Sequence, residues 1–438
     1  MPYTEPELRH ADLLLVLPLS YRMVDGHVYF DRQSRASLDR HLKSFDSLIM
    51  AMVLMKESEV AKDSIFVWDL ADDLLDRVQF VPLPSGNVRE FLQVYSETAR
   101  TLRHCINSAD RLLFAIGGAG GLHQDWGQVA AEQAIKLGRR FALHADWNSF
   151  GVIATAAQRE KGLARLPRKL KTLFKAWLVR RWQGRLVARC DLMICNGIDI
   201  KMAYTPLCRS PEIAYKINDF QIGPDKFVKP EEVEAKCQDV LSRPKLLVRY
   251  AGRAVPMKGP IHWIHAIHEA HRLGAQIEAT WLGDGPLLDE MKAEVAKLGL
   301  GDVVKLPGFV ADRDEVIGAI RGADLMMFAH LDPESPRVLI ESLISATPIV
   351  GYFRNHPKDL ISENEGGVMT PLGDPKALGK VIAELAADRP RVADLIRRAA
   401  RDGARFDSDR MDAARCAKIK EMIQPAPPRQ SLEPSVPS

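Results

Sequence analysis

The sequence lacks paired cysteines, long apolar runs and any strong excess of charge of one sign. Its six cysteines follow no CxxC pattern and no regular spacing: Cys105, Cys190, Cys195, Cys208, Cys237 and Cys416. A disulfide framework and a cysteine zinc site are therefore not expected, and the pattern fits a reducing compartment. The net charge is only +3 over 438 residues. Any basic surface must come from local clustering, and binding to nucleic acid is not expected, since no RNA-recognition motif is present either.

Apolar runs long enough to cross a bilayer are also missing. The run from Leu13 to Leu19 is far shorter than the about 20 residues that a membrane-spanning helix needs, and Pro18 interrupts it. The N-terminal stretch MPYTEPELRH is acidic and polar, without the charged and then apolar pattern of a signal peptide. We therefore expect a cytoplasmic protein.

The sequence does contain a regular alternation of short apolar runs and longer amphipathic stretches. Hydrophobic residues make up 46% and charged residues 27% of the chain, as in globular proteins, and its length suggests two domains. The alternation predicts parallel βα units in an α/β protein. We expect an N-terminal domain at 1–225, a second domain at 226–405, a last helical segment at 406–423 and a disordered Pro/Ser-rich tail at 424–438.

The alternation also predicts individual elements. In the first half, strands are expected at Leu13–Leu17, Leu48–Leu54, Ser64–Trp68, Val78–Pro82, Leu112–Ile116, Phe141–Ala145 and Leu192–Cys195, and helices at Arg32–Phe45, Val88–Ala109, Trp126–Leu137 and Arg168–Arg189. In the second half, strands are expected at Leu246–Tyr250, Ala279–Leu282, Val303–Leu306, Leu325–Ala329 and Ile349–Tyr352, and helices at Pro260–Leu273, Leu287–Leu298, Asp314–Arg321, Pro336–Ser345, Pro375–Ala387 and Asp409–Met422. Prolines punctuate the stretch from Thr205 to Pro244, where we expect the interdomain linker.

The densest motif is LLVRYAGRAVPMKG, at residues 246–259. An expected strand runs into Gly252 and Arg253, and a short loop delivers Lys258 to the start of an expected helix. A guanidinium can bind two phosphate oxygens at once through parallel hydrogen bonds, and an ammonium adds a point charge. A helix N-terminus favours an anion. These features predict a diphosphate site at Arg253 and Lys258. Two solvated surface cations are the alternative.

Two later segments strengthen this prediction. Residues 280–286 read TWLGDGP, a strand that ends in a glycine turn, and residues 332–352 read DPESPRVLIESLISATPIVGY. In the second segment a helix is expected to begin near Pro336 and to carry Glu341 in its second turn. A carboxylate there can accept both hydroxyls of a ribose, while the backbone N–H groups at the helix start face phosphates. An ion pair with a neighbouring cation is the alternative for Glu341.

In order and spacing, these segments resemble the donor domain of GT-B-fold retaining glycosyltransferases, specifically family 4, or glycosyl transferases group 1. The shared features are the GR and KG pairs, the G-x-G-P turn and the E-x7-E helix with its small-residue turn, and they cover Leu246 to Val368. The resemblance implies two doubly wound Rossmann-like domains that face each other across a cleft. It also implies a C-terminal helix that crosses back to the N-terminal domain.

The resemblance further implies roles for individual residues. Arg253 and Lys258 would hold the diphosphate of a nucleoside-diphosphate sugar, the donor, and Glu341 would hold its ribose. The rest of the donor-binding set would be Gly26, Gly252, Gly283, Gly285, Ser335, Pro336, Arg337 and Val338. The implied reaction moves a hexose, with retention of configuration, to a glycan or lipid-linked acceptor in bacterial polysaccharide or glycolipid biosynthesis. No cofactor besides the donor substrate and no essential metal are expected.

The first glutamate of the E-x7-E motif departs from the family pattern. Pro333 occupies its place and Glu334 follows one residue later, so the spacing to Glu341 is E-x6-E. We expect a bulged loop to bring Glu334 to the donor sugar, or Ser335 and nearby backbone amides to replace it. The shift favours one alternative function, a non-catalytic sugar-nucleotide-binding subunit. An epimerase or a phosphorylase on the same fold is the other alternative.

The N-terminal half, which recognises the acceptor in GT-B enzymes, carries fewer motifs. His144 and Asp146 end an expected strand, and we expect one or both to contact the donor sugar or the acceptor. A structural histidine is the alternative. Gly26, after the first strand, resembles the glycine loop beneath the donor phosphates. The run Gly117-Gly118-Ala119-Gly120-Gly121 lacks the GxGxxG phase, so a glycine turn is favoured over a dinucleotide site.

A basic amphipathic stretch is the other feature of this half. Residues 159–189 hold eleven Lys and Arg against one acid, and apolar residues that include two tryptophans recur there at helical spacing. Such a helix is typical of a membrane surface, where each basic residue near anionic headgroups contributes about 1 kcal/mol. The expected membrane or acceptor face comprises Lys169, Lys171, Lys175, Trp177, Arg180 and Arg181. It would lie on the inner face of the plasma membrane and favour a lipid-linked acceptor. Packing of the apolar stripe on the sheet is the alternative.

Two further patterns imitate metal sites. Histidines recur every third residue on one expected helix, at His262, His265, His268 and His271. Side chains at that spacing drift by about 60° each around the axis, so they do not converge on one ion. Asp312 with Asp314, and Asp407 with Asp409, spell DxD. Both pairs precede expected helices, where Asp is a common N-cap residue.

Overall fold

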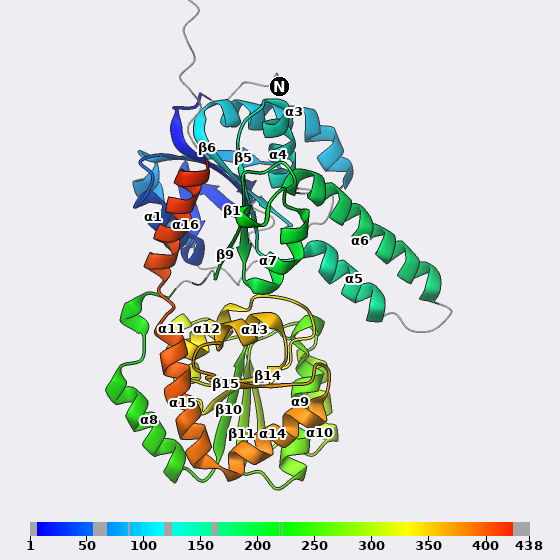
Figure 1. The fold of residues 1–438 in the computed structure, drawn as a ribbon, viewed down its shortest axis with the longest axis vertical. Coiled ribbons are helices and arrows are strands. Elements are labelled where there is room, and N and C mark those ends of the chain that lie inside the picture. Colours follow the sequence, from blue (N-terminus) through cyan, green and yellow to red (C-terminus); the bar gives the residue numbers. More distant parts are fainter. Residues whose placement is uncertain are drawn as a thin grey trace, which may run out of the picture.

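The computed structural model describes residues 7–55, 68–85, 88–117, 125–159, 165–218, 220 and 222–423. These residues form two α/β domains, with the N-terminal domain at the top of Figure 1 and the second domain below it. Each domain is built on one sheet whose faces are covered by helices.

The N-terminal sheet is doubly wound. Its parallel strands follow the order β5-β3-β1-β6-β7-β8-β9. Their bounds are β1 Ala11–Val24, β3 Leu48–Leu54, β5 Val78–Leu83, β6 Ala109–Ile116, β7 Ala142–Ala145, β8 Leu192–Asn196 and β9 Ala214–Ile217. After an irregularity between Val16 and Ser20, β1 forms an antiparallel hairpin with β2 (His27–Asp31). Strand β4 (Trp68–Leu70) extends that hairpin.

Hydrophobic clusters occupy both faces of this sheet. One cluster contains side chains of α3 (Val88–Asn107), α4 (Trp126–Lys136), α7 (Ile198–Tyr204) and the last turns of α6 (Leu166–Val187). The other contains side chains of α1 (Arg32–Leu42) and of α16 (Ser408–Met422). Helix α5 (Ser149–Arg159) packs beside α6, and Figure 1 shows both helices extending sideways from the body of the domain.

The second domain is a six-stranded parallel sheet in the order β12-β11-β10-β13-β14-β15. The strands are β10 Leu246–Ala251, β11 Ile277–Leu282, β12 Val304–Gly308, β13 Leu325–Phe328, β14 Ile349–Tyr352 and β15 Gly367–Thr370. The helices are α8 Pro230–Ser242, α9 Pro260–Arg272, α10 Leu288–Lys297, α11 Arg313–Arg321, α12 Arg337–Ile344, α13 Asn355–Leu360, α14 Pro375–Ala387 and α15 Arg389–Gly403. Trp263 and Trp281 are fully buried at the centre of its core, with their rings 5.6 Å apart.

In both sheets the strand order reverses beside the first strand, between β1 and β6 and between β10 and β13. Ligands of doubly wound sheets bind beyond the carboxyl ends of the strands at such a switch point. The residue at the end of β8, Asn196, accepts a hydrogen bond from Ser335, which follows β13. The carboxyl ends of the two sheets therefore face each other.

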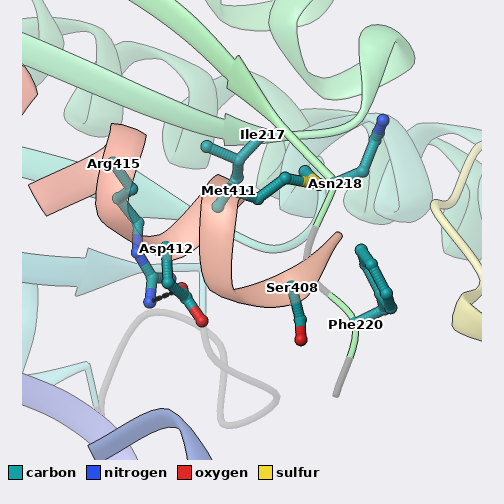
Figure 2. Close-up of a pocket in the computed structure, with 7 residues that line it drawn as sticks. All are labelled: Ile217, Asn218, Phe220, Ser408, Met411, Asp412 and Arg415. Carbon is teal, nitrogen blue, oxygen red and sulfur yellow. Dashed lines mark hydrogen bonds and ion pairs between the residues drawn. The ribbon is translucent and has the colours of Figure 1, made fainter. Parts of the chain in front are cut away.

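The chain crosses between the domains twice, along adjacent paths. It leaves the N-terminal domain after β9 and returns just before α16, and the rings of Phe220 and Phe406 on the two paths pack edge to face at 6.2 Å. Figure 2 shows a small cavity between the outgoing strand and α16, lined by Ile217, Asn218, Phe220, Ser408, Met411, Asp412 and Arg415. Asp412 pairs with Arg415 and with Arg40 of α1, which anchors α16 on the N-terminal domain. The two crossing paths thus form one packed hinge.

The linker expected from Thr205 to Pro244 is wrong at both ends. Strand β9 pairs with β8 and extends the N-terminal sheet, while α8 packs against α15 of the second domain. Only residues 218–229 lie between β9 and α8. The prolines misled the prediction because Pro is well tolerated in the first turn of a helix, as Pro230 is in α8.

Other differences concern short elements. The long amphipathic helices agree within a few residues, and α14 has the predicted bounds. The first strand was expected to be short, whereas β1 continues into the hairpin with β2. Helices α5, α7, α8, α13 and α15 and strands β2, β9 and β15 were not predicted. The expected strand Ser64–Trp68 falls mostly, and the tail at 424–438 entirely, outside the described residues.

Candidate active site at the domain interface

Arg253 and Lys258 both follow the first strand of the second domain. After β10 the chain passes through Gly252 and Arg253 and makes a 3-10 turn, η7 (Pro256–Lys258), before α9 begins. Arg253 is exposed, and no hydrogen bond or ion pair within the described residues engages its guanidinium. Leu331, beyond the end of β13, donates from its backbone N–H to the Met257 carbonyl at 2.8 Å. This contact places Lys258 at the switch point of the sheet.

Lys258 is paired with Glu334. Its Nζ lies 2.7 Å from Glu334 Oε2, and the two side chains are only 16% and 13% exposed. Burial raises the pKa of the Glu334 carboxyl, while the nearby ammonium of Lys258 opposes the shift. The loop after β13 thus brings Glu334 to the diphosphate-binding cation predicted from the sequence.

A buried histidine and tyrosine support this pair. His330 Nδ1 lies 3.2 Å from Glu334 Oε1, and His330 Nε2 lies 2.6 Å from the hydroxyl of Tyr250. Burial lowers the pKa of His330 well below its usual range and raises that of Tyr250 well above its usual range. Both groups are therefore neutral. The sequence interpretation missed them, although His330 is a polar residue directly after a buried apolar strand.

The G-x-G-P turn packs on the Arg253 loop. The Ala254 N–H donates to the Asp284 carbonyl at 2.9 Å, and the Gly252 N–H donates to the Leu282 carbonyl at 2.8 Å. A Cβ atom at Gly283 would lie 2.1 Å from the Gly252 carbonyl oxygen, and one at Gly285 would lie 2.6 Å from that of Ala254. These glycines allow the two loops to approach at backbone distance and fix the path of the chain at Arg253.

Helix α12 begins beside the Lys258–Glu334 pair. Pro336 is its N-cap residue and no side chain caps its first turn, which contains Arg337 and the buried Val338. An uncapped helix N-terminus directs free N–H groups outward and favours an anion. The next turn carries Glu341, which is buried and paired with Arg313 at the start of α11. Glu341 therefore has the ion pair that the sequence left open as its alternative.

The N-terminal domain contributes residues from the ends of β7 and β8. His144 is buried, and its Nε2 lies 3.4 Å from Asp146 Oδ1. Asn196 Nδ2 donates to the same carboxylate at 3.3 Å, and the Asn196 carbonyl accepts from Ser335 Oγ at 2.5 Å. The structure thus links the predicted residues His144 and Asp146 to Ser335 through Asn196, which the sequence interpretation had not singled out.

The seam between the domains also contains a buried histidine. His356 of α13 has no hydrogen-bond partner for either ring nitrogen within the described residues. Burial lowers its pKa to about 4. A Cβ atom at Gly197 would lie 2.0 Å from Ser335 Oγ and 2.7 Å from His356 Nδ1. The main chain at Gly197 therefore packs directly against the second domain. Asp199 of α7 adds a hydrogen bond to the His356 N–H at 3.1 Å.

Gly26 lies in a hairpin turn at the end of β1. With Asp25 it makes the turn of the β1–β2 hairpin, and its neighbour His27 pairs with Asp72 at 2.5 Å. No hydrogen bond or ion pair in the described part of the chain joins this turn to Lys258 or Glu334. The hairpin was not expected from the sequence, because β1 continues past its expected end, and the role of Gly26 at the donor phosphates stays a prediction.

The glycine run after β6 is described only at its first residue. The Gly117 N–H donates to the carboxylate of Asp125 at 2.7 Å, and Asp125 also caps α4. Residues 118–124 lie outside the described part of the chain. Gly117 thus takes part in a turn closed by an acidic side chain, which favours the glycine-turn interpretation.

The predicted basic face lies on α6. Lys171, Lys175, Arg180 and Arg181 are exposed and Lys169 is half-buried. The apolar residues of the same helix are exposed too: Leu166, Leu170, Leu173, Phe174, Trp177 and Leu178. Phe174 and Trp177 are 59% and 54% exposed, and their rings stack at 5.7 Å. Among the described residues, the buried positions of α6 lie from its middle onward, at Ala176, Val179, Gln183, Leu186 and Val187. The stripe thus does not pack on the sheet along the first half of α6.

Residues of the two patterns that imitate metal sites have structural roles. Asp312 caps α11 and Asp407 caps α16 through their side chains, as expected. On α9, His262 Nδ1 lies 2.9 Å from the Tyr352 hydroxyl, and His265 Nε2 lies 3.0 Å from Glu294. Among the described residues, no helix is long and apolar enough to cross a membrane.

Several known proteins resemble this chain in sequence. Residues 234–402 match the family described as Glycosyl transferases group 1. A 2-deoxystreptamine glucosyltransferase of Streptomyces kanamyceticus is 24% identical over 330 residues, which cover 65% of this chain and 81% of that protein. The amylovoran biosynthesis glycosyltransferase AmsK of Erwinia amylovora is 29% identical over 189 residues, which cover 42% of this chain and 45% of AmsK. The chain thus matches less than half the length of AmsK.

Solved structures share the architecture over nearly the whole chain. HepE of Anabaena, in complex with UDP and glucose, superposes with a TM-score of 0.62 at 16% identity, and the match covers 94% of this chain and 100% of HepE. At that identity the likeness concerns the fold. The GT-B fold expected from the sequence is therefore confirmed.

Proposed function

We propose that this GT-B protein, with a glycosyl transferases group 1 match in its second domain, transfers a sugar from a nucleoside-diphosphate sugar to an acceptor. The observation that carries the proposal is the position of Lys258. Its ammonium lies at the switch point of the second sheet, 2.7 Å from a buried carboxylate, and the exposed Arg253 lies on the loop that leads to it. Two cations and an uncapped helix N-terminus suit a diphosphate.

The chemistry follows from these charges. When the bond between the sugar and the β-phosphate breaks, negative charge gathers on the diphosphate. Arg253 and Lys258 stabilise that charge, and a cation contributes more in a water-poor cleft than in solution. Because both cations come from the protein, we propose that no essential metal is needed. Glu341 would exchange its ion pair with Arg313 for the hydroxyls of the ribose.

The proposed identity of the donor is supported by similar proteins. HepE, which shares the fold, was crystallised with UDP and glucose, and two relatives are named glycosyltransferases. These names support a nucleoside-diphosphate hexose as donor. We propose retention of configuration from the resemblance to family 4. In that family the glutamate that corresponds to Glu334 contacts the donor sugar.

The acceptor is proposed to be a glycan or a lipid-linked sugar. A relative that acts in amylovoran biosynthesis supports polysaccharide chemistry. Helix α6 supports a lipid surface, because it exposes apolar side chains among lysines and arginines and contains no acidic residue. Such a surface suits anionic headgroups. We therefore propose peripheral binding through α6 to the inner face of the plasma membrane.

The decisive experiment has two stages. A thermal-shift screen with UDP-, GDP- and ADP-sugars identifies the donor, because a ligand bound to the folded state raises its melting temperature. The stabilising donor is then incubated with candidate acceptors, without acceptor and with inorganic phosphate, and the products are separated. Acceptor-dependent transfer is expected. Donor binding without release of nucleoside diphosphate under any condition would instead indicate a binding subunit, and reaction without acceptor or with phosphate would indicate an epimerase or a phosphorylase.

A further inference from the structure

On the basis of the proposed function, we infer that Glu334 pairs with Lys258 until a diphosphate displaces it, and that His330 then holds the freed carboxylate. Glu334 would thus be the internal counter-ion of the site as well as a neighbour of the sugar. His330 would act through Glu334, as a positioning residue.

The first step concerns the cation. Glu334 is the partner of Lys258 among the described residues, at 2.7 Å. A diphosphate bound to the same ammonium would lie beside the Glu334 carboxylate, and two anions that share one buried site repel each other. The diphosphate carries more negative charge than the carboxylate and also binds the guanidinium of Arg253, so it displaces the carboxylate.

The second step concerns the carboxylate that is left. A buried carboxylate without a cation is costly unless hydrogen bonds replace the ion pair. Glu334 Oε1 is a buried oxygen that accepts no hydrogen bond within the described residues. His330 Nδ1 lies 3.2 Å from it, close enough for a bond but not aligned for one. A small rotation of Glu334 away from Lys258 would complete that bond.

The third step fixes the proton on His330. The groups that face its ring are Tyr250 from β10, Lys258 from η7, His356 from α13 and Glu334 from its own loop. Burial, Lys258 and His356 keep the ring neutral, so it carries one proton. A carboxylate only accepts, and the Tyr250 hydroxyl can donate to Nε2, which leaves the proton on Nδ1. His330 is therefore a donor held in place by Tyr250 and directed at Glu334.

The first test measures nucleoside diphosphate binding, without a sugar. Calorimetry with UDP, GDP and ADP on the full chain identifies the one that binds. Glu334→Gln should bind it about tenfold tighter, a change of about 1.4 kcal/mol, because no ion pair has to be broken. The gain should be smaller when Lys258→Ala is the background, because no ion pair is then broken and only the repulsion between Glu334 and the diphosphate is relieved.

Equal or weaker binding by Glu334→Gln in the wild-type background would overturn the counter-ion role while leaving the proposed function standing. A gain that is undiminished with Lys258→Ala would also overturn it, because the effect would then not pass through Lys258. Failure of the wild-type protein to bind any of the three diphosphates would sink the proposed function itself, and with it the inference.

The second test compares two substitutions of His330. In His330→Asn the side-chain amide stands in for Nδ1 and can still donate to Glu334, whereas in His330→Gln it stands in for Nε2 and reaches only Tyr250. We expect kcat for sugar transfer to be about tenfold higher in His330→Asn than in His330→Gln, a difference of about 1.4 kcal/mol. Diphosphate should also bind His330→Asn more tightly than His330→Gln, because only the asparagine can hold the freed carboxylate, whereas the melting temperatures should match. Equal kcat values would overturn the positioning role of His330.

Discussion

Ser335 Oγ donates a hydrogen bond to the carbonyl oxygen of Asn196 at 2.5 Å, and this bond joins the two domains next to the Lys258–Glu334 pair. Asn196 also donates to Asp146, so the same residue connects both sheets at their carboxyl ends. A closed cleft excludes water and aligns the reacting groups. Domain closure and the geometry of the proposed site are therefore coupled through the Ser335–Asn196 bond.

Gly197 tests this coupling. Its φ is 90°, and a Cβ atom there would lie 2.0 Å from Ser335 Oγ, so Gly197→Ala should force the domains apart. Because the proposed diphosphate contacts belong to the second domain alone, nucleoside diphosphate affinity should remain near wild type. Sugar transfer should fall by about 100-fold, as expected for a misplacement of about 1 Å. Calorimetry and initial-rate assays measure the two quantities.

Gly138→Ala is the control for backbone strain. Gly138 also has a positive φ, of 65°, but a Cβ atom there would meet nothing within 4 Å. Gly138→Ala should lower the melting temperature without a selective effect on sugar transfer. If Gly197→Ala transfers sugar at the rate of Gly138→Ala, closure through Ser335 does not control the reaction.

Arg253 tests the diphosphate assignment without disturbing the fold. The side chain is exposed and has no ion pair or hydrogen bond with any residue that the structure describes, so Arg253→Ala should leave the melting temperature unchanged. Loss of one preorganised charge contact to the leaving diphosphate should lower kcat/KM by about 100- to 1000-fold. Lys292→Ala on α10, which removes another exposed cation of the same domain, is the matched control. Near-wild-type kcat/KM in Arg253→Ala would refute the assignment.

The sequence predicted the fold well where local pattern and tertiary structure agree. Helix α14 begins at Pro375 after the N-cap residue Asp374 and has the predicted bounds. The prediction from the sequence failed at β9 and α8, because short elements that begin near prolines were interpreted as breaks in the secondary structure. The hairpin after β1 was missed for a related reason: its pairing with β2 and β4 is a tertiary contact that the sequence period does not reveal.

The candidate site was predictable only in part. Lys258 and Glu334 were both named from the motif, but no pattern indicated that they pair, because residues 76 positions apart meet only through the order of β10 and β13. The partner of Glu341, Arg313, belongs to a DxD pattern that was interpreted as a helix cap. His330 and Asn196 share a signal that was not used: each is a polar residue at the end of a buried apolar strand.

Helix α6 makes the membrane proposal testable. Phe174 and Trp177 are exposed near Lys171 and Lys175, so the double variant Phe174→Ala/Trp177→Ala should bind vesicles about tenfold more weakly or worse, since each buried aromatic side chain contributes about 1.5–3 kcal/mol. Lys171→Glu/Lys175→Glu should also weaken binding, at about 1 kcal/mol for each lysine lost. Cosedimentation with phosphatidylglycerol vesicles measures both effects.

The controls for α6 are a neutral lipid and a distant apolar residue. Phosphatidylcholine vesicles should bind the wild-type protein weakly, and Leu92→Ala, which removes a 68% exposed leucine from α3, should bind phosphatidylglycerol normally. Binding that is equal for wild type and the α6 variants would show that α6 does not contact the bilayer.

His356 predicts a specific dependence of stability on pH. Burial lowers its pKa from 6.5 to about 4, so the folded protein holds the ring neutral where the unfolded chain protonates it. The contribution of His356 is thus fully present above pH 6.5 and is lost as pH falls toward 4, by about 1.4 kcal/mol for each unit. His356→Leu should remove this contribution, and it should not destabilise the protein at pH 5, because both ring nitrogens lack partners among the described residues. Urea unfolding at pH 7.5 and pH 5 measures the free energies, with His271→Gln, at an exposed position of α9, as control. A pH slope in His356→Leu as steep as that of wild type would mean that His356 is protonated, and so accessible, in the folded protein.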